Sequence, residues 1–426
     1  MTLVVMMSEV INLAIKLTEQ LPEELVSFMQ VAGKVAHRQD QKLYLVGGVV
    51  RDLLLKRTNF DLDLVVEGNA INLARELAGI NQGKIVTHPR FGTAKLQWDK
   101  WSVDVATARL ETYVKPGALP SVKSGAIKND LSRRDFTINA MAIELNPGRY
   151  GQLLDFFDGR NDLKHKLIRV LHDKSFIDDA TRIWRGLRYE QRLGFQLEPT
   201  TLRLLKRDVS YLDTISGDRI RHELELILRE EYPEKVLHRA EELGVLPKLN
   251  PAQKGNGWLA EKFEQARKLS SPDLPSTGFY LALLAYRLSE EENEQLISYL
   301  RLAKSVAQIL RDTINIKTKL ELLANSELSP SSIYSLLHVY SLPAILAGSL
   351  TADSPVSRQH INLYLNKLRY IKPALNGEDI SRMGVDSGPR IKEILTLLRE
   401  GRLDGEITTK KDEEGLVKRW LAKVKR

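Results

Sequence analysis

The spacing of apolar and polar positions divides the chain into two regions. Between about Leu43 and Ile143, short apolar or alternating runs predict strands, because successive side chains of a strand point to opposite faces. Between these runs, apolar residues recur at helical spacing. The strands and helices together predict a small α/β or α+β head. The predicted strands are Leu43–Val46, Phe60–Val66, Thr93–Trp98 and Ser102–Ala106, with a turn at Asp99-Lys100, and the predicted helices are Val49–Leu55 and Ala70–Leu77.

The pattern changes after about Pro147. From Leu163 to the end, the chain shows successive amphipathic helices and few strand candidates. Breaks between helices are predicted at Pro247–Gly257, Ser270–Ser276 and Ser326–Ser332. No fixed-period repeat or low-complexity tract is present. A head of this kind followed by a long helical body suits chemistry at one end and binding along the rest.

The composition of the chain limits the classes of protein to which it can belong. A chain of 426 residues exceeds one compact core, so two to four domains are expected. The absence of cysteine excludes disulfides, thiolate zinc sites and a cysteine nucleophile. The net charge of +8 suits a polyanionic partner, although many basic proteins bind no nucleic acid. Met1–Leu17 is predicted to form an amphipathic helix rather than a membrane span, because Glu9 interrupts it, so we expect a cytoplasmic protein without membrane association.

The strand that begins at Phe60 carries two acidic residues. Asp61 and Asp63 share one face, roughly 6.5–7 Å apart along the strand, while Phe60, Leu62 and Leu64 are expected to point into the core. Two carboxylates on one face can hold Mg²⁺ ions, which complete their shells with water and phosphate oxygens. Asp104 alternates with valines on another predicted strand and is a third candidate. The alternative is an exposed acidic strand face without a metal.

A double glycine, Gly47-Gly48, precedes the acidic strand and stands between a strand and a helix. Glycine there lets backbone N–H groups approach an anion at the helix start, and Arg51 in the helix can grip a phosphate. The alternative is a tight turn with a surface pair of Arg51 and Asp52. No G-x-G-x-x-G, P-loop, H-E-x-x-H or G-x-S-x-G pattern is present, which disfavours Rossmann dehydrogenases, P-loop NTPases and common hydrolases.

Taken together, these stretches resemble the nucleotidyltransferase superfamily that includes DNA polymerase β. A close resemblance to class II tRNA nucleotidyltransferases and bacterial poly(A) polymerases is carried by the sequence LVGGVVRDLLL…NFDLDLVVEG. The resemblance covers about Leu43 to Leu228. Further stretches of the family pattern follow in order: VDVATAR (Val103–Arg109), DLSRRDFTINAMA (Asp130–Ala142), LLDFFDGRNDL (Leu153–Leu163), DDATRIWRGLR (Asp178–Arg188) and RIRHEL (Arg219–Leu224).

The resemblance implies an α+β fold, with a polymerase-β-like head and an all-helical neck, body and tail. It implies an N-terminal helix at 1–25, the head at 26–150, the neck at 151–245, and a tRNA-binding body and tail at 246–426. The FDGRND stretch matches a flexible hinge, and Leu110–Asn129 matches a flexible loop that governs the switch from C to A. A plain turn is the alternative for the hinge.

The resemblance also implies roles for residues of two later motifs. Arg134, Asp135 and Asn139 belong to the motif that contacts the ribose and triphosphate of the nucleotide. Asp179 and Arg182, three residues apart on a predicted helix, share a face and can read the Watson–Crick edges of cytosine and adenine in place of a template.

The same helix is predicted to continue a basic stripe towards the triphosphate. Arg185 and Arg188 form this stripe, while Ile183, Trp184 and Leu187 face the core. The alternative is Asp178 as an N-cap followed by an exposed ion-pair face. The family sequence at this position is Glu-Asp-Pro, whereas this chain has Asp178-Asp179-Ala180. Whether the chain adds the full series of nucleotides, C, C and A, is therefore left open.

Near the C-terminus two stretches are candidates for RNA contacts. Met383–Arg390 resembles a G-x-x-P-G-P turn of the family, in which Ser387 replaces the first proline, and a plain helix connection is the alternative. The run Leu416–Arg426 is a basic amphipathic helix, for which an exposed face is favoured over a tRNA contact.

The function that the resemblance implies is CCA-end synthesis or repair. Asp61 and Asp63 would hold Mg²⁺, with help from Asp104, and CMP and/or AMP would be added to the tRNA 3′ end from CTP and ATP, with no obligate protein partner. CC-only or A-only addition stays open. The alternatives are a poly(A) polymerase on the same fold and a non-catalytic RNA-binding protein.

Overall fold

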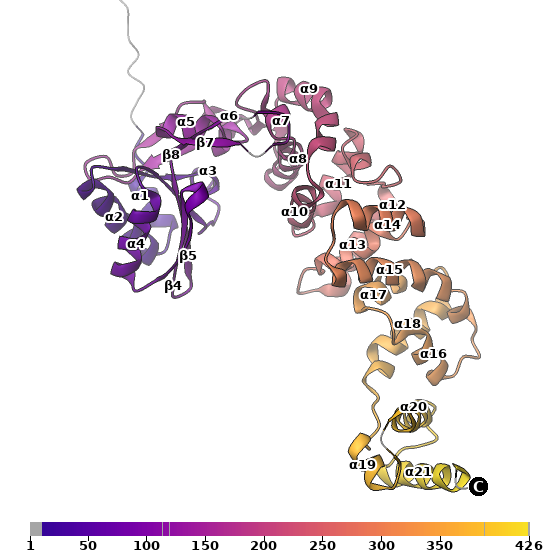
Figure 1. Cartoon of the computed structure of the whole chain (residues 1–426). Coiled ribbons are helices and arrows are strands. Elements are labelled where there is room, and N and C mark those ends of the chain that lie inside the picture. Colours follow the sequence, from indigo (N-terminus) through magenta and orange to yellow (C-terminus); the bar gives the residue numbers. More distant parts are fainter. Residues whose placement is uncertain (1–10, 113, 119, 387, 425–426) are drawn as a thin grey trace, which may run out of the picture. The chain divides into compact units, whose positions relative to one another are not determined.

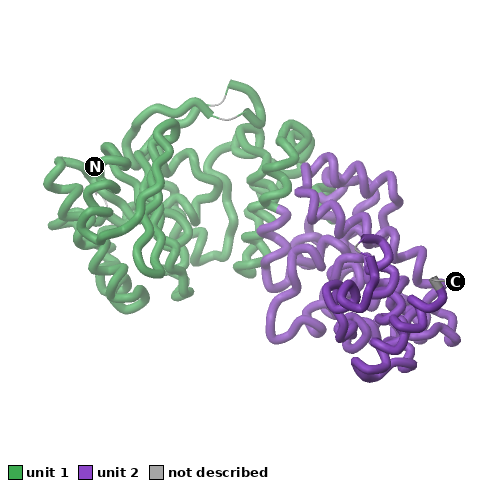
Figure 2. The backbone as a smooth tube through the Cα atoms, turned by 60° about the horizontal axis from the view of Figure 1, so that its bottom comes forward, with its two compact units in different colours: residues 1–223, 242–245 green, residues 224–241, 246–426 purple. Residues whose placement is uncertain are grey.

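The computed structural model describes residues 11–112, 114–118, 120–386 and 388–424. It divides into two compact units, the first comprising residues 1–223 and 242–245 and the second residues 224–241 and 246–426 (Figure 2). Among the described residues no single helix is long and apolar enough to cross a membrane. One pair of helices passes that test jointly, but it is bent by 115°.

A mixed sheet lies in the head (Figure 1). It has seven strands in the order β3-β4-β5-β2-β1-β8-β9. Strands β2 and β5 run parallel in its middle, and the other neighbouring pairs are antiparallel. The strands are β1 (Lys42–Val46), β2 (Leu62–Glu67), β3 (Lys84–His88), β4 (Thr93–Trp98), β5 (Trp101–Thr107), β8 (Met141–Glu144) and β9 (Leu153–Asp155). Three of the four predicted strands are confirmed to within one residue, the strand predicted from Phe60 begins only at Leu62, and the turn at Asp99-Lys100 connects β4 to β5.

Helices cover the sheet because alternate strand residues are apolar. The amphipathic helix α2 (Glu23–Arg38) packs on β1, and α4 (Ala70–Asn81) packs on β3, β4 and β5. Leu62 and Leu64 are buried, as predicted. The opposite face of the sheet packs against α5 (Ile127–Ser132) through a second apolar cluster.

The predicted N-terminal helix is only partly described. Helix α1 spans Ala14–Gln20, whereas residues 1–10 lie outside the described part of the chain. Two backbone hydrogen bonds attach this segment to the sheet edge, from the Leu13 amide to the Gly151 carbonyl (2.7 Å) and from the Leu153 amide to the Ile11 carbonyl (2.9 Å). The segment is therefore packed on the head.

The stretch from Leu110 to Asn129, predicted as a loop, contains ordered structure. Strands β6 (Arg109–Thr112) and β7 (Ser121–Ser124) pair as an antiparallel hairpin. The connection between them includes residues 113 and 119, which lie outside the described residues.

The rest of the first unit is helical apart from the short parallel pair β10 (Leu167–Ile168) and β11 (Gln196–Leu197). Its helices are α3 (Gly48–Leu54), α6 (Gly159–His165), α7 (Ser175–Asp178), α8 (Thr181–Leu193), α9 (Pro199–Asp208) and the start of α10 (Gly217–Ile227). Short 3₁₀ turns occur at Pro89–Phe91, Thr137–Asn139 and Val209–Thr214.

The second unit is helical throughout its described residues, as predicted. Two separate apolar clusters stabilise it, one around Ile345 and Ile361 and one around Ile394 and Val417. Connections between helices fall at the three predicted breaks. The helices are α11 (Pro233–Glu242), α12 (Gly257–Ser270), α13 (Thr277–Ala285), α14 (Glu290–Tyr299), α15 (Lys304–Lys319), α16 (Pro330–Leu337), α17 (Leu342–Thr351), α18 (Pro355–Asn366), α19 (Gly377–Arg382), α20 (Pro389–Leu403) and α21 (Lys410–Val424), with 3₁₀ turns at Leu246–Lys248, Leu322–Ala324 and Leu368–Tyr370.

The two C-terminal candidates fall at the last helices. Gly384 and Gly388 have φ angles of +94° and +125°, so the predicted turn needs glycine at both positions before α20 begins at Pro389. Ser387 lies outside the described residues. The basic run from Leu416 forms the end of α21, and its last two residues also lie outside. RNA contact by either stretch stays a prediction.

Candidate active site

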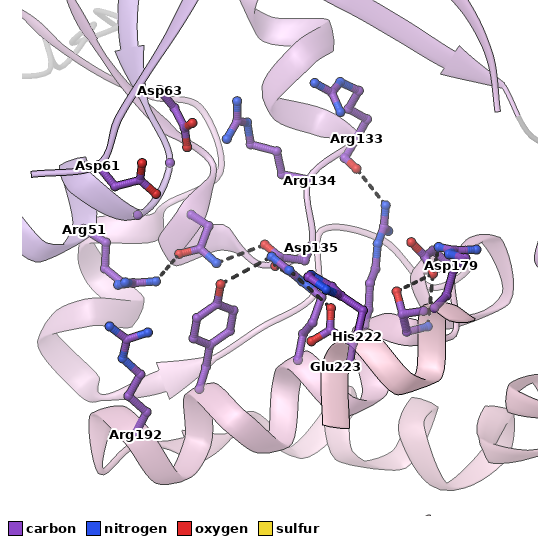
Figure 3. A pocket seen from close by; sticks show the side chains of 18 of the residues that line it. Arg51, Asp61, Asp63, Arg133, Arg134, Asp135, Asp179, Arg192, His222 and Glu223 are labelled. Carbon is purple, nitrogen blue, oxygen red and sulfur yellow. Dashed lines mark hydrogen bonds and ion pairs between the residues drawn. The ribbon is translucent and has the colours of Figure 1, made fainter. Parts of the chain in front are cut away.

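A pocket of about 880 Å³ lies in the first unit, and polar side chains dominate its wall (Figure 3). Asp61 and Asp63 stand at one end and Asp179 at the other, with Arg134 and Asp135 between them. The lining residues are Gly47, Gly48, Arg51, Thr58, Asn59, Asp61, Asp63, Arg109, Glu111, Pro120, Arg133, Arg134, Asp135, Asn139, Asp179, Thr181, Arg182, Arg185, Tyr189, Arg192, Asp218, Arg219, His222 and Glu223.

The acidic end is built on the two central strands. Asp63 on β2 is the register partner of Asp104 on β5, so both carboxylates lie on the same face of the sheet. Burial raises the pKa of Asp63 to about 6, Arg134 opposes that rise, and the negative charges of Asp61 and Asp104 add to it. Negative charge is therefore concentrated at this end of the pocket.

The residues before β2 differ from the prediction in one respect. Asp61 stands just ahead of the strand, where its amide donates to the Asn59 side-chain oxygen at 3.0 Å. Phe60 does not enter the core: it is 40 % exposed and meets the Trp101 ring edge-on at 6.0 Å between centroids. The strand begins too late to point this ring inward.

The donors at the acidic end suit a hard divalent cation. Aspartate oxygens are the ligands that Mg²⁺ and similar ions take, usually one or two per ion, and a cation there would offset the burial and the repulsion that together raise the Asp63 pKa. Asp104 is instead paired with Lys95 at 3.3 Å and does not line the pocket. Within the described part of the chain, no three aspartate, glutamate or histidine side chains are close enough to form a metal shell by themselves. Asp61 and Asp63 could therefore hold a metal that completes its shell with water and phosphate, whereas metal binding by Asp104 stays a prediction.

The double glycine turns the chain beside these carboxylates. Gly47 has a φ of +80°, which disfavours any side chain. A Cβ placed there would lie 3.1 Å from Arg134 Nη1 and 3.4 Å from Asp63 Oδ2. The turn therefore lets the backbone pass between a basic and an acidic side chain of the pocket.

Arg51 is buried within the protein rather than part of a surface pair. Its Nε and Nη2 donate to the two Asp52 oxygens at 2.9 and 2.8 Å, and its Nη1 donates to Asn139 Oδ1 at 2.7 Å. Only 3 % of Arg51 is exposed, so the surface-pair alternative is wrong. Its guanidinium still lines the pocket, and phosphate contact by Arg51 stays a prediction.

Asn139 continues this buried chain of contacts to Asp135. Asn139 Nδ2 donates to Asp135 Oδ1 at 3.0 Å, and Arg185 donates to Asp135 Oδ2 from Nε at 2.9 Å and from Nη2 at 2.6 Å. Burial opposes ionisation of Asp135, but Arg185 and these hydrogen bonds lower its pKa to about 2. Asp135 is therefore a buried, ionised acceptor that connects the head to α8.

Arg133 and Arg134 share a buried carboxylate. Arg133 Nη2 donates to Asp130 Oδ1 at 2.7 Å, and Arg134 Nη2 donates to Asp130 Oδ2 at 3.0 Å. Burial would raise the pKa of Asp130, and the two guanidinium groups lower it below its usual range. Arg133 also pairs with Glu111 of the β6–β7 hairpin at 3.0 Å. Asp130 and Glu111 thus orient two cations at the pocket wall.

The segment predicted as one helix from Asp178 is broken at Asp179. Helix α7 ends at Asp178, Asp179 is extended (φ −145°, ψ 97°), and α8 begins at Thr181. Asp179 and Arg182 therefore do not share a helical face, contrary to the prediction, because the Asp179 carboxylate accepts from the Thr181 amide (3.0 Å) and hydroxyl (2.6 Å). The alternative, with Asp178 as an N-cap, is also wrong, because Asp178 is the last residue of α7 and α8 begins at Thr181. Both Asp179 and Arg182 nevertheless line the pocket.

Arg182 is held by protein acceptors. It is 5 % exposed, and it donates from Nη1 to Ser175 Oγ at 2.8 Å and from Nη2 to the Arg133 carbonyl at 2.7 Å. These contacts fix the position of the guanidinium. Base reading by the two residues stays a prediction.

The basic stripe on α8 forms ion pairs at a glutamate. Arg185 Nη1 and Arg188 Nη2 lie 3.6 and 3.7 Å from the Glu223 carboxylate, and burial raises the pKa of Glu223. Arg185 lines the pocket, whereas Arg188 is not among the lining residues. The core-facing side of the helix is confirmed, with Ile183, Trp184 and Leu187 buried.

The predicted hinge is an ordered turn. Asp155 accepts from the Gly159 and Arg160 amides at 2.8 and 2.9 Å, and buried Asp162 accepts from Arg169 and from the Thr137 hydroxyl. These contacts describe one conformation, so flexibility of the turn stays a prediction.

Several pocket residues were not singled out from the sequence. Arg219, His222 and Glu223 lie in the RIRHEL stretch, whose resemblance to the family was noted without a role for its side chains. Tyr189 follows Arg188 on α8, and Arg51, Arg185 and Arg188 lie over its ring at 5.1, 5.7 and 5.1 Å from the centroid. The charged residues of the RIRHEL stretch were the sequence signal that could have identified these side chains, whereas no local sequence pattern identifies Tyr189.

Comparisons with known proteins agree with this geometry. Residues 43–169 match the family model of the poly A polymerase head domain, and residues 194–255 match that of a probable RNA and SrmB-binding site of polymerase A. A protein from Halalkalibacterium halodurans, named A-adding tRNA nucleotidyltransferase, is 32 % identical over 94 % of this chain and 94 % of its own length. The chain belongs to the tRNA nucleotidyltransferase and poly(A) polymerase family.

Other members of the family show how far the likeness extends. A Geobacter sulfurreducens protein, also named A-adding tRNA nucleotidyltransferase, is 36 % identical over 95 % of this chain but only 48 % of its own length, so the chain spans about half of that relative. The solved structure of a Thermotoga maritima CCA-adding enzyme complexed with tRNA is similar with a TM-score of 0.75 and 33 % identity, over 97 % of this chain and all of that one. The α+β head and helical remainder are those of the family, and a nucleotidyltransferase head of this fold implies a divalent metal.

Proposed function

We propose that this protein adds CMP and/or AMP to the 3′ end of tRNA from CTP and ATP, without a nucleic-acid template. The observation that supports this most directly is the pocket itself, which has Asp61 and Asp63 at one end, Asp179 at the other, and Arg133 and Arg134 between them. An elongated, charged nucleoside triphosphate suits that arrangement. The names of the relatives, A-adding and CCA-adding, favour tRNA as the acceptor and AMP as one of the added nucleotides.

The reaction proposed is an in-line nucleotidyl transfer. The oxygen of the tRNA 3′-hydroxyl forms the new bond to the α-phosphorus, the bond from that phosphorus to the oxygen bridging to the β-phosphate breaks, and pyrophosphate leaves with the electron pair. The hydroxyl proton passes to solvent. Mg²⁺ bound by Asp61 and Asp63 would supply charge neutralisation at the reacting phosphate.

The remaining residues hold and select the nucleotide. Arg134, directed past Gly47 towards Asp63, is placed to bind the triphosphate close to the reacting phosphorus. At the far end, the Asp179 carboxylate can accept a hydrogen bond from the amino group that cytosine and adenine share. Protein side chains thereby replace a template strand.

The first experiment measures extension of three tRNA transcripts, lacking CCA, ending in C and ending in CC, each given Mg²⁺ with CTP, ATP or both. Products that stop at CCA identify a complete CCA-adding enzyme, and addition of A only to the CC-ending tRNA identifies an A-adding enzyme. Long A tails would transfer the assignment to a poly(A) polymerase. If no transcript is extended, the proposed function is wrong.

A double variant tests the acidic end. Asp61→Asn with Asp63→Asn should lower the extension rate by at least about a thousandfold while the circular-dichroism spectrum stays unchanged, because the variant keeps shape but loses the metal ligands. The matched control removes two exposed charges of the second unit, Asp273→Asn with Asp353→Asn, and should keep the rate. Equal rates in the two double variants would contradict the metal assignment.

A further inference from the structure

Arg219 contacts the carboxylate that is placed to read the base. It comes from α10, forty positions beyond Asp179 in the sequence, and its Nη2 forms an ion pair with Asp179 Oδ1 at 2.7 Å. Both side chains line the pocket and are partly exposed, Arg219 by 32 % and Asp179 by 21 %. The ion pair of Arg219 and Asp179 therefore lies where it can affect a nucleotide in the pocket.

Three contacts of this carboxylate share one oxygen. Asp179 Oδ1 receives the Thr181 amide at 3.0 Å, the Thr181 hydroxyl at 2.6 Å and the Arg219 ion pair at 2.7 Å. With Oδ1 engaged in this way by described residues, Oδ2 is the oxygen left to accept from a group in the pocket. A carboxylate with one oxygen fixed has its second oxygen fixed as well.

The position of Arg219 is itself determined by a second segment. Its Nη1 lies 3.5 Å from the Gly117 carbonyl, in the connection of the β6–β7 hairpin, and Gly117 packs against Thr214. A Cβ at Gly117 would stand 2.6 Å from Thr214 Oγ1, and φ there is +71°, so only glycine fits. The guanidinium is thus shared between the hairpin connection and Asp179.

We infer that Arg219 is a positioning residue that fixes the direction of the Asp179 carboxylate and thereby sets the preference for amino-bearing bases over keto-bearing bases. This inference rests on the proposed function. Cytosine and adenine present an amino donor where uracil and guanine present a carbonyl acceptor, and a fixed carboxylate oxygen accepts only from the donor. Because Asp179 stands at the break between α7 and α8, its side chain is not oriented by a helix and depends on Thr181 and Arg219.

The test compares extension of tRNA transcripts with ATP against GTP, and with CTP against UTP, as ratios of kcat/KM. In Arg219→Met the ratio for whichever amino nucleotide the wild type adds should fall by about ten- to a hundredfold, the effect of losing one charge-assisted contact. Arg219→Lys keeps a cation that reaches the same oxygen and should recover part of the ratio. Asp179→Asn should lower the ratio alone, and Arg219→Met should lower it little further in that background.

The matched control is Arg311→Met in the second unit. Arg311 is 44 % exposed and pairs with Glu294 at 2.6 Å, and neither residue lines the pocket, so its loss removes a similar charge and ion pair and the ratios should stay at the wild-type value. Equal losses for all four nucleotides in Arg219→Met, or unchanged ratios, would overturn the inference while leaving the proposed function standing.

A binding measurement separates the two proposals. The dissociation constants of ATP and GTP, measured by calorimetry for the wild type and for Arg219→Met, report selection without any transfer step. If the wild type extends no transcript, the proposed function fails, yet a loss of ATP-over-GTP binding preference in Arg219→Met would still support the role of Arg219. An unchanged binding preference in the variant would overturn that role.

Discussion

Arg185 and Asp135 are fifty positions apart in the sequence, yet the Arg185 Nη2 lies 2.6 Å from the Asp135 Oδ2. The contact joins the Asp130–Ala142 stretch of the head to α8, the helix that follows the break at Asp179, and a second donor, Nε, strengthens it at 2.9 Å. A two-donor ion pair therefore ties α8 to the head in the middle of the pocket wall.

Asp135→Asn should destabilise the first unit by about 3 kcal/mol, because it leaves the Arg185 guanidinium beside a neutral amide in a mostly buried place. Urea unfolding followed by tryptophan fluorescence measures this. The control, Asp386→Asn, breaks an ion pair whose carboxylate is 88 % exposed and should cost less than about 0.5 kcal/mol. Equal effects of the two variants would contradict the coupling.

The same carboxylate gives a pH dependence with a definite sign. Its pKa in the fold is about 2, below the value of about 3.9 expected when unfolded. Between these values the unfolded chain binds more protons, so the contribution of Asp135 is present above pH 4 and is lost as pH falls towards 2, amounting to about 2–3 kcal/mol. Unfolding free energies between pH 5 and 2 should fall less steeply in Asp135→Asn than in the wild type. Parallel curves would show that Asp135 does not contribute.

Gly47→Ala should reduce nucleotide addition by at least about tenfold and cost about 1–2 kcal/mol in stability, since its φ is +80° and the new Cβ would stand 3.1 Å from Arg134 Nη1. The control is Gly79→Ala within α4, where nothing lies within 4 Å of the new Cβ. That change should leave addition unchanged and stabilise by up to about 1 kcal/mol. If both alanines act alike, the close approach at Gly47 has no effect on the reaction.

Asn139→Ala should lower stability by about 1–3 kcal/mol, because Arg51 Nη1 and Asp135 Oδ1 each lose a buried partner. Expressed as a free energy, its effect on the rate of nucleotide addition should exceed its effect on stability, because the substitution disconnects Arg51 from Asp135 within the pocket wall. Asn72→Ala, an exposed position of α4, is the control and should be neutral. Melting temperatures and extension rates of both variants are compared, and an Asn139→Ala protein with wild-type rates would refute the connection.

Glu413→Ala should loosen the C-terminal helices locally. Glu413 is fully buried and accepts hydrogen bonds from the Ala374 and Leu375 amides at 2.9 and 2.8 Å, and from Arg402. Hydrogen exchange within residues 374–424 should accelerate by at least about tenfold, while amides of the head sheet stay protected. The exposed Glu393→Ala serves as control and should leave exchange unchanged. Uniform acceleration in both units would show that the second unit does not open separately.

Local elements were predictable from the sequence where periodicity is strong. Alternation of apolar residues predicts β4 at its observed bounds, Thr93–Trp98, and the helical spacing after Gly48 and Ala70 predicts α3 and α4. Strands β6 and β7 were missed because their partly exposed residues carry no apolar alternation, and pairing with each other determines their conformation.

Asp61 and Asp63, and the polar residues at the other end of the pocket, were also identified from the sequence. The hydrogen bonds and ion pairs that hold these residues were not. The break at Asp179 depends on hydrogen bonds from Thr181, which compete with helical geometry and leave no trace in apolar spacing. The contact of Arg219 with Asp179 joins segments that only the folded chain brings together. Long-range polar contacts of this kind follow from tertiary packing rather than from local residue preference.

The central position of β2 and β5 has a consequence for how the protein tolerates insertions. Asp63 and Asp104 are register partners on adjacent strands, and each strand has another strand on its far side, so neither can slide without breaking two ladders. Added residues in the connection between α4 and β3, or between β6 and β7, would lengthen loops while leaving the spacing of the two carboxylates unchanged. Variation in the length of the β6–β7 connection, which contributes Pro120 to the pocket wall, can therefore alter what enters the pocket without altering the spacing of these two carboxylates.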